Sequence, residues 1–101
     1  MKLFIVTCLK ELLGDISKIF KLANIDIFSS GDIIGHRDGQ PPGILEEWFA
    51  SGNPQFDSVM IFAFTSDANT KLGIELIIDY NKKLKENFPV RAFVLPVEKY
   101  V

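Results

Sequence analysis

The titratable side chains of this chain are not spaced like those of an enzyme active site. The only histidine, His36, belongs to no Ser-His-Asp triad or metal-binding motif, and a histidine in a Gly-rich polar segment is more often solvated than a ligand. Glu46 and Glu47 are adjacent, so on a helix their carboxylates would point about 100° apart. The single cysteine, Cys8, has no second cysteine or histidine near it and is expected to be a small buried side chain at the end of a strand. We therefore predict no enzyme, with neither catalytic nor metal-binding residues.

Regular hydrophobic patterning stops for 23 residues, at 35–57, a segment with four of the seven glycines and three of the five prolines. Loops longer than about 12–15 residues are uncommon in a small domain and are usually functional or disordered. Apolar residues at i, i+1, i+4 and i+5 of the run Ile44–Phe49 would form one stripe of a short helix. The segment either packs Trp48 against its own domain or presents Leu45, Trp48 and Phe49 to a partner protein.

Length and charge restrict the class of protein. Residues 1–101, with a mass of 11.4 kDa, are expected to form a single domain. Eleven basic against thirteen acidic residues give a net charge of −2, and the largest basic cluster is the short run Lys82–Lys85, so nucleic acid is excluded as a partner. The apolar N-terminal run Met1–Leu9 is too short for a signal peptide, and no stretch reaches the roughly 18–20 apolar residues of a membrane span. We predict a cytoplasmic protein.

Periodicity predicts six elements in the order βαββαβ. Consecutive apolar and β-branched residues indicate strands covered on both faces, and apolar residues three and four apart indicate amphipathic helices. Ser66 or Asp67 is expected to cap the second helix and Pro89 to end it. Gly31 is expected to mark a bulge, and Pro96 favours an edge position for the last strand. The expected ranges are strand 3–7, helix 9–24, strand 25–34, strand 59–64, a helix between 67 and 89, and strand 90–97.

This order predicts an α+β fold of the ferredoxin-like kind, a two-layer sandwich with the long loop between strands 2 and 3. Right-handed crossovers would place both helices on one face of the sheet. The runs 3–6, 59–64 and 92–95 nevertheless carry large apolar side chains on both faces. A bare sheet face of that composition would exceed the few hundred Å² of apolar surface that soluble monomers expose. We therefore predict a homo-oligomer that buries its sheets against each other.

Two segments carry a resemblance to a known family. The segment Gly35–Gly39 is similar to the Gly-Arg-Gln-Lys-Gly sequence that opens the long T-loop of PII-like nitrogen-regulatory and signal-transduction proteins, and Arg91–Glu98 resembles their closing strand. The order of elements resembles that family over the whole chain. The resemblance implies a homotrimer with its sheets turned inward, which binds a small effector in a cleft between subunits. It also implies that the long loop controls a partner protein, such as a membrane transporter.

The resemblance also implies which residues bind the effector. They are Gly35, His36, Arg37 and Gly39 at the loop base, where glycine N–H groups suit an anion and Arg37 can pair with a phosphate. Family members add a Gly-rich turn after the second helix, but the corresponding residues here, Lys85–Pro89, contain no glycine. We therefore expect a small anionic effector and poor nucleotide binding, and the cofactor stays unassigned.

A different class of protein is consistent with the same elements. Small enzymes of the dimeric α+β barrel kind also pack ferredoxin-like sheets together, and they enclose a substrate pocket between helices and sheet. In that case His36 would act as an acid or base. The number of subunits separates the two hypotheses, because the first predicts three and the second two.

Overall fold

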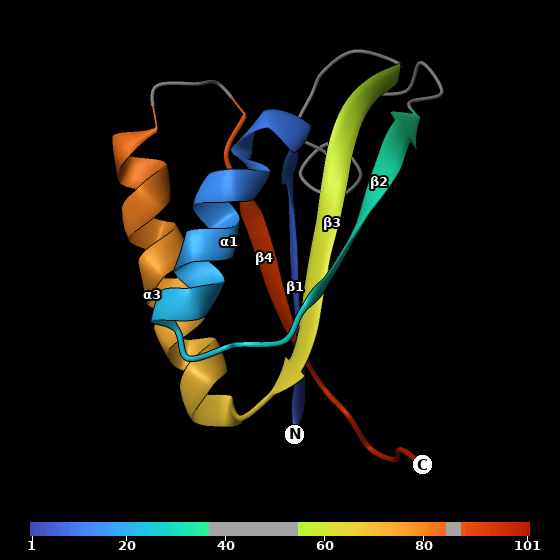
Figure 1. The fold of residues 1–101 in the computed structure, drawn as a ribbon, viewed down its shortest axis with the longest axis vertical. Coiled ribbons are helices and arrows are strands. Elements are labelled where there is room, and N and C mark those ends of the chain that lie inside the picture. Colours follow the sequence, from blue (N-terminus) through green and yellow to red (C-terminus); the bar gives the residue numbers. More distant parts are fainter. Residues whose placement is uncertain (37–54, 85–87) are drawn as a thin grey trace.

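The computed structural model describes residues 1–36, 55–84 and 88–101. The described residues form two layers, a four-stranded antiparallel sheet and two α-helices that lie on the same face of it (Figure 1). The predicted α+β class is confirmed. The strands are β1 (Lys2–Leu9), β2 (Ser29–His36), β3 (Gln55–Thr65) and β4 (Arg91–Pro96); the helices are α1 (Leu13–Leu22) and α3 (Asp67–Lys83), and a 3-10 turn, η1 (Lys10–Leu12), precedes α1.

The strands are arranged in the order β2-β3-β1-β4, and each neighbouring pair is antiparallel. The strand containing Pro96 therefore lies at an edge of the sheet, as its missing N–H group predicted. The predicted bulge at Gly31 is wrong, because β2 pairs with β3 residue for residue and Gly31 lies opposite Met60. A Cβ at Gly31 would have no neighbour within 4 Å, so packing does not require glycine there.

The two strands that flank the long connection extend farther into it than the sequence pattern indicated. Gly35 and His36 are the last residues of β2, and they lie opposite Phe56 and Gln55 at the start of β3. Hydrogen bonding between backbones does not depend on apolar side chains, so a strand can continue through polar residues. The connection between the strands is therefore residues 37–54, which lie outside the described residues.

Helix α1 ends in a Schellman motif. Asn24 has a positive φ of 64° and its N–H donates to the carbonyl of Lys21, while the N–H of Ile25 donates to the carbonyl of Phe20 at 2.9 Å. The motif turns the chain so that Ile25 packs into the core next to the end of the helix. Ile25, which the pattern placed in the second strand, thus belongs to the connection that precedes β2.

Side chains on α3 fix both of its ends. The Ser66 hydroxyl accepts a hydrogen bond from the Asn69 N–H at 3.2 Å, which confirms Ser66 as the predicted cap. Near the other end, the side-chain amide of Asn81 donates to the Val90 carbonyl and accepts from the Val90 N–H, both at 2.9 Å. This double hydrogen bond holds the chain just before β4 against the helix.

The core fills the space between the two layers. The ring of Phe20 on α1 lies between Phe4 of β1 and Phe28, with ring centroids 5.2 and 5.1 Å away. Cys8 is buried in this core, as predicted. The buried apolar residues are Phe4, Val6, Cys8, Leu12, Ile16, Ile19, Phe20, Ala23, Ile25, Val59, Ile61, Ala63, Ile77 and Val90.

We call the face of the sheet that carries no helix the open face. Side chains alternate along a strand, so residues that neighbour the buried Phe4 and Ile61 in sequence lie on it. Phe62 and Phe64 pack edge to face there, and Phe64 is 57% exposed. The described residues thus carry large apolar side chains on both faces. The open-face residues are Leu3, Ile5, Thr7 and Leu9 of β1, Ser58, Met60, Phe62 and Phe64 of β3, Arg91, Phe93 and Leu95 of β4, and Ser29, Gly31 and Ile33 of β2.

Candidate functional site

The residues predicted from sequence to bind a ligand or a partner are only partly described. Gly35 and His36 lie at the end of β2, where they pair with β3 as part of the sheet. Arg37 and Gly39, and the partner-binding set Leu45, Trp48 and Phe49, lie outside the described residues. The described residues closest to the predicted ligand-binding segment are those around the end of β2.

Three polar side chains cross the open face next to this end of the sheet. Arg91 on β4 lies opposite Thr7 on β1, and Thr7 lies opposite Met60 on β3. Ser58 is two residues from Met60 on the same face, so it is a diagonal neighbour of Thr7. We call Arg91, Thr7 and Ser58 the polar row.

The polar row reaches almost to the base of the long connection. Ser58 pairs with Ile33 of β2, and Gly35 follows two residues later on the same face of that strand. The register thus places Ser58 close to Gly35, whereas Arg91 lies on β4, the edge strand on the other side of the sheet from β2.

The two hydroxyl residues of the polar row are buried. Thr7 and Ser58 are each only 2% exposed. The Ser58 hydroxyl oxygen is fully buried and has no hydrogen-bond partner. Burying a hydroxyl without a partner costs about 1–3 kcal/mol, so the Ser58 hydroxyl has an unsatisfied capacity to hydrogen-bond.

Arg91 is the only charged residue on the open face of the described strands. Within the described part of the chain its side chain makes no hydrogen bond or ion pair. A planar guanidinium binds carboxylate or phosphate groups with two parallel hydrogen bonds. The polar row therefore has the chemistry of a site for a small anion.

Sequence patterning did not identify the polar row. The signal in β4 was present, because Arg91 shares a strand face with Phe93 and Leu95, where an unpaired charge is unexpected. For Thr7 and Ser58 the missing information was the strand register, which places two distant residues on neighbouring strands.

A pocket of about 520 Å³ lies at the end of β1, and the described residues that line it are Leu9, Lys10, Glu11 and Asp57. Leu9 lies opposite Ser58 in the sheet. The Lys10 ammonium forms an ion pair with Asp32 at 2.8 Å, and this hydrogen bond, together with the nearby Asp57 carboxylate, raises the pKa of Lys10. Since Lys10 is already paired, Arg91 is the better cation for an incoming anion.

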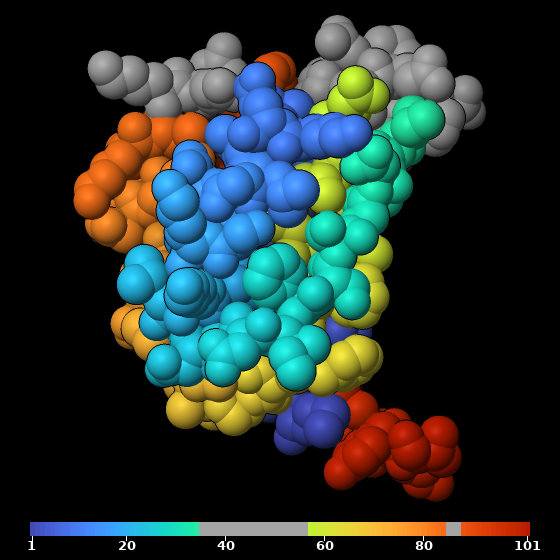
Figure 2. Space-filling model, in the orientation of Figure 1, coloured from blue at the N-terminus to red at the C-terminus, as the bar shows by residue number. Residues whose placement is uncertain are grey.

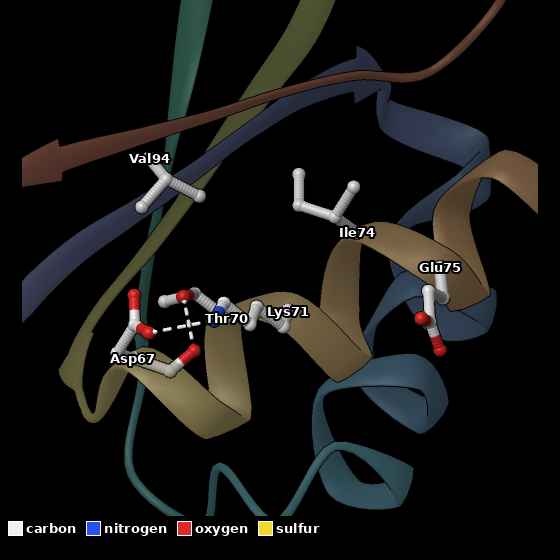
Figure 3. A pocket seen from close by; sticks show the side chains of 6 residues that line it. All are labelled: Asp67, Thr70, Lys71, Ile74, Glu75 and Val94. Atoms are coloured by element: carbon white, nitrogen blue, oxygen red, sulfur yellow. Dashed lines mark hydrogen bonds and ion pairs between the residues drawn. The ribbon is translucent and has the colours of Figure 1, made fainter.

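A second pocket, of about 380 Å³, lies between α3 and the edge strand β4 (Figure 3). Of its four polar residues, Glu75 is exposed and the other three interact with each other. Asp67 pairs with Lys71 at 3.2 Å, and the buried Thr70 hydroxyl donates to the Asp67 carbonyl at 2.7 Å. The apolar lining consists of Ile74 of α3 and Val94 of β4 (Figure 3). This pocket offers no unpaired buried group to a ligand.

The Cys8 thiol is a poor nucleophile, because it stays protonated near neutral pH. Burial raises the pKa of this thiol to about 12, so almost no thiolate is present near neutral pH. Within residues 1–36, 55–84 and 88–101, no three His, Cys, Asp or Glu side chains come together as they would to hold a metal ion. None of the helices in these residues has both the length and the apolar character needed to cross a bilayer.

The chain was also compared with known proteins. No protein-family model matches it, and no curated protein shows significant similarity to it. A functional assignment therefore depends on the geometry described above.

Proposed function

We propose that this chain is a PII-like regulatory protein with a ferredoxin-like fold. The strand order β2-β3-β1-β4, with both helices on one face, is the arrangement that right-handed βαβ crossovers produce from the element order of this chain. The long connection between β2 and β3 corresponds to the T-loop of that family. These features support the resemblance that the sequence motifs suggested.

The open face is the surface through which copies of the chain associate, as a trimer with the sheets turned inward. Its apolar side chains include Phe64, which is 57% exposed, and Leu95, which is 43% exposed. Burying a side chain of this size contributes about 1.5–3 kcal/mol. Several such residues on each copy provide the driving force for assembly.

The effector is a small anion that binds at the polar row. Sheet packing would remove water from Arg91, and an unpaired buried guanidinium costs several kcal/mol. An anion bound to Arg91 and the Ser58 hydroxyl would remove this cost, so effector binding and assembly favour each other. The unpaired Arg91, the only charged residue on the open face of the described strands, is the observation that carries the proposal.

Signalling passes from the polar row to the long connection, since Gly35 lies two residues from Ile33, the partner of Ser58. Leu45, Trp48 and Phe49 then contact the regulated protein, for which a membrane transporter is the example the family offers. Regulation by an effector in this way requires no catalytic residue in the chain.

The alternative of a dimeric α+β barrel enzyme has less support. Such an enzyme needs a substrate pocket between helices and sheet. In the described residues core side chains such as Phe4, Ile16 and Phe20 fill most of that space, and the pocket between α3 and β4 has no unpaired buried group among the residues that line it. No observation on the described residues favours the enzyme.

The assembly is tested by light scattering after gel filtration. The native protein should have about three times the monomer mass of 11.4 kDa. Phe64→Asp should reduce this to the monomer mass and leave the far-UV circular dichroism spectrum unchanged, whereas Ile78→Asp, at a similarly exposed residue of α3, should not change the mass. A native monomer, or a Phe64→Asp protein that stays trimeric, would contradict the model.

The effector site is tested by calorimetry with inorganic phosphate as the probe. Arg91→Gln should weaken binding by about 1.5–3 kcal/mol, the contribution of a charge-assisted hydrogen bond. Lys2→Gln is the matched control, because Lys2 is a cation of the same sheet whose side chain lies on the helical face. Equal loss in both variants would indicate a nonspecific charge effect and would remove Arg91 from the site.

A further inference from the structure

A groove of about 410 Å³ lies on the helical side of the molecule, between α1 and the connection that leads from it to β2. Figure 2 shows these two segments side by side on the visible face of the molecule. The residues that line the groove are Ser17, Lys18, Lys21, Ile25, Asp26 and Phe28. Its volume is in the range of small-molecule sites in proteins.

Charges of opposite sign line this groove without pairing. Lys18 and Lys21 are three residues apart on α1, so they share one side of the helix, and Asp26 belongs to the opposite wall. In the described residues none of these three side chains forms an ion pair or a hydrogen bond. A ligand that carries both an anionic and a cationic group would complement them.

The floor of the groove is apolar. Ile25 is buried in the core, and Phe28 is partly buried with its ring packed on Phe20 at 5.1 Å. Because the Schellman motif and the core fix these side chains, the floor exists without a ligand. The remaining polar wall residue, Ser17, already donates its hydroxyl to the Leu13 carbonyl at 2.8 Å.

We propose that this groove binds an α-amino acid with an apolar side chain. Its carboxylate lies between Lys18 and Lys21, its ammonium faces Asp26, and its side chain covers Ile25 and Phe28. A simple carboxylate would leave Asp26 unpaired, and a simple amine would leave both lysines unpaired. A zwitterion with an apolar side chain can pair with all three charged residues of the groove and also cover its apolar floor.

This site is separate from the polar row and does not depend on the proposed function. The groove is formed by α1 and the connection after it, whereas Arg91, Thr7 and Ser58 lie on the opposite face of the sheet. It remains accessible whether or not the open faces pack together.

The experiment compares three probes that share a 2-phenylethyl group: phenylalanine, 3-phenylpropanoate, which lacks the ammonium group, and 2-phenylethylamine, which lacks the carboxylate. Each is titrated into the native protein at low salt, and binding is followed by amide chemical shifts in two-dimensional NMR spectra. Phenylalanine should bind about fivefold more tightly than either analogue, because each analogue lacks one of the two charged groups that form exposed ion pairs with the groove. The shifted amides should be those of residues 17–28.

Substitutions test which charged residue of the groove pairs with which charged group of the ligand. Asp26→Asn should abolish the preference for phenylalanine over 3-phenylpropanoate, and the double variant Lys18→Gln, Lys21→Gln should abolish the preference over 2-phenylethylamine. Glu75→Gln and Lys82→Gln on α3 are the charge-matched controls and should leave all three affinities unchanged. Equal affinities of the three probes for the native protein, or shifts centred on other residues, would overturn the proposal.

Discussion

Gly73 of α3 lies so close to the ring of Phe4 on β1 that a Cβ atom at residue 73 would be 2.8 Å from the ring atom Cζ. Phe4 is fully buried, and its ring also packs against the ring of Phe20. The Phe4 ring therefore has little room to move away from a side chain added at Gly73. The missing side chain at Gly73 therefore lets the helix approach the sheet, and it sets the distance between the two layers at this point.

Gly73→Ala should destabilise the protein by about 1–3 kcal/mol, the usual cost of adding a methyl group to a packed core. Urea unfolding followed by circular dichroism measures the change. Gly14→Ala on α1 is the matched control, because a Cβ there meets nothing within 4 Å and alanine should stabilise the helix by about 0.4–1 kcal/mol. A Gly73→Ala protein as stable as Gly14→Ala would show that the layers are farther apart than described.

Cys8 should resist alkylation in the folded protein. Burial raises the pKa of its thiol from 9.0 to about 12, so at pH 8 the reactive thiolate is about 1,000-fold rarer than in an unfolded chain. Iodoacetamide labelling followed by mass spectrometry, with and without urea, measures the ratio. Rapid labelling of the native protein would contradict the burial of Cys8.

The same pKa shift predicts how stability depends on pH. The folded state favours the neutral thiol, so this contribution is complete below pH 9.0 and is lost as the pH rises toward 12. Cys8→Ala should remove that part of the slope of unfolding free energy against pH. If the slope between pH 9 and 11 were identical in Cys8→Ala, another group would be responsible.

Asn81→Ala should destabilise the protein by about 1–3 kcal/mol, because the N–H and carbonyl of the buried residue Val90 would both lose their partner. Asn81→Asp should be at least as damaging at neutral pH, since a carboxylate cannot donate to the Val90 carbonyl. Thermal unfolding compares both variants with Lys82→Ala, an exposed neighbour on α3. Equal melting temperatures for all three proteins would show that the double hydrogen bond contributes nothing.

Ser58→Ala should leave the ligand-free protein as stable as before, or more stable by up to about 1 kcal/mol, because it removes a buried hydroxyl that has no partner. It should also weaken phosphate binding. Ser17→Ala is the contrasting control, since the Ser17 hydroxyl donates to the Leu13 carbonyl and its loss should cost about 0.5–1.5 kcal/mol. A clear destabilisation by Ser58→Ala in phosphate-free buffer would mean that the hydroxyl has a partner in the protein itself.

The elements were predictable from sequence where one strong local signal set them. Runs of consecutive apolar residues identified β1 and β3, and Ser66 marked the start of α3. The pattern failed at Ile25, because an apolar residue that packs after a helix has the same composition as one in a strand. It also placed the first helix at Leu9, since it could not distinguish η1 and the end of β1 from a regular helix.

The candidate site was less predictable, because strand register determines it. Arg91, Thr7 and Ser58 are distant in sequence and meet only through two antiparallel pairings. A sequence motif records neighbours along the chain, and no motif covers residues brought together across three strands. The apolar composition of both strand faces was nevertheless readable, and it led to the open face on which the polar row lies.

The Asn81–Val90 hydrogen bonds also affect how the sheet can grow. The Val97 N–H donates to the Met1 carbonyl, so the odd-numbered residues of β4 bond to β1 and the even-numbered ones face outward. Among the outward-facing backbone groups, the N–H and carbonyl of Val90 are hydrogen-bonded to the Asn81 side chain, and Pro96 has no N–H. Only Ala92 and Val94 present an unpaired N–H along this edge. A side-chain amide and a proline thus leave too short a template for another strand, which protects β4 from the edge-to-edge aggregation to which exposed strands are prone.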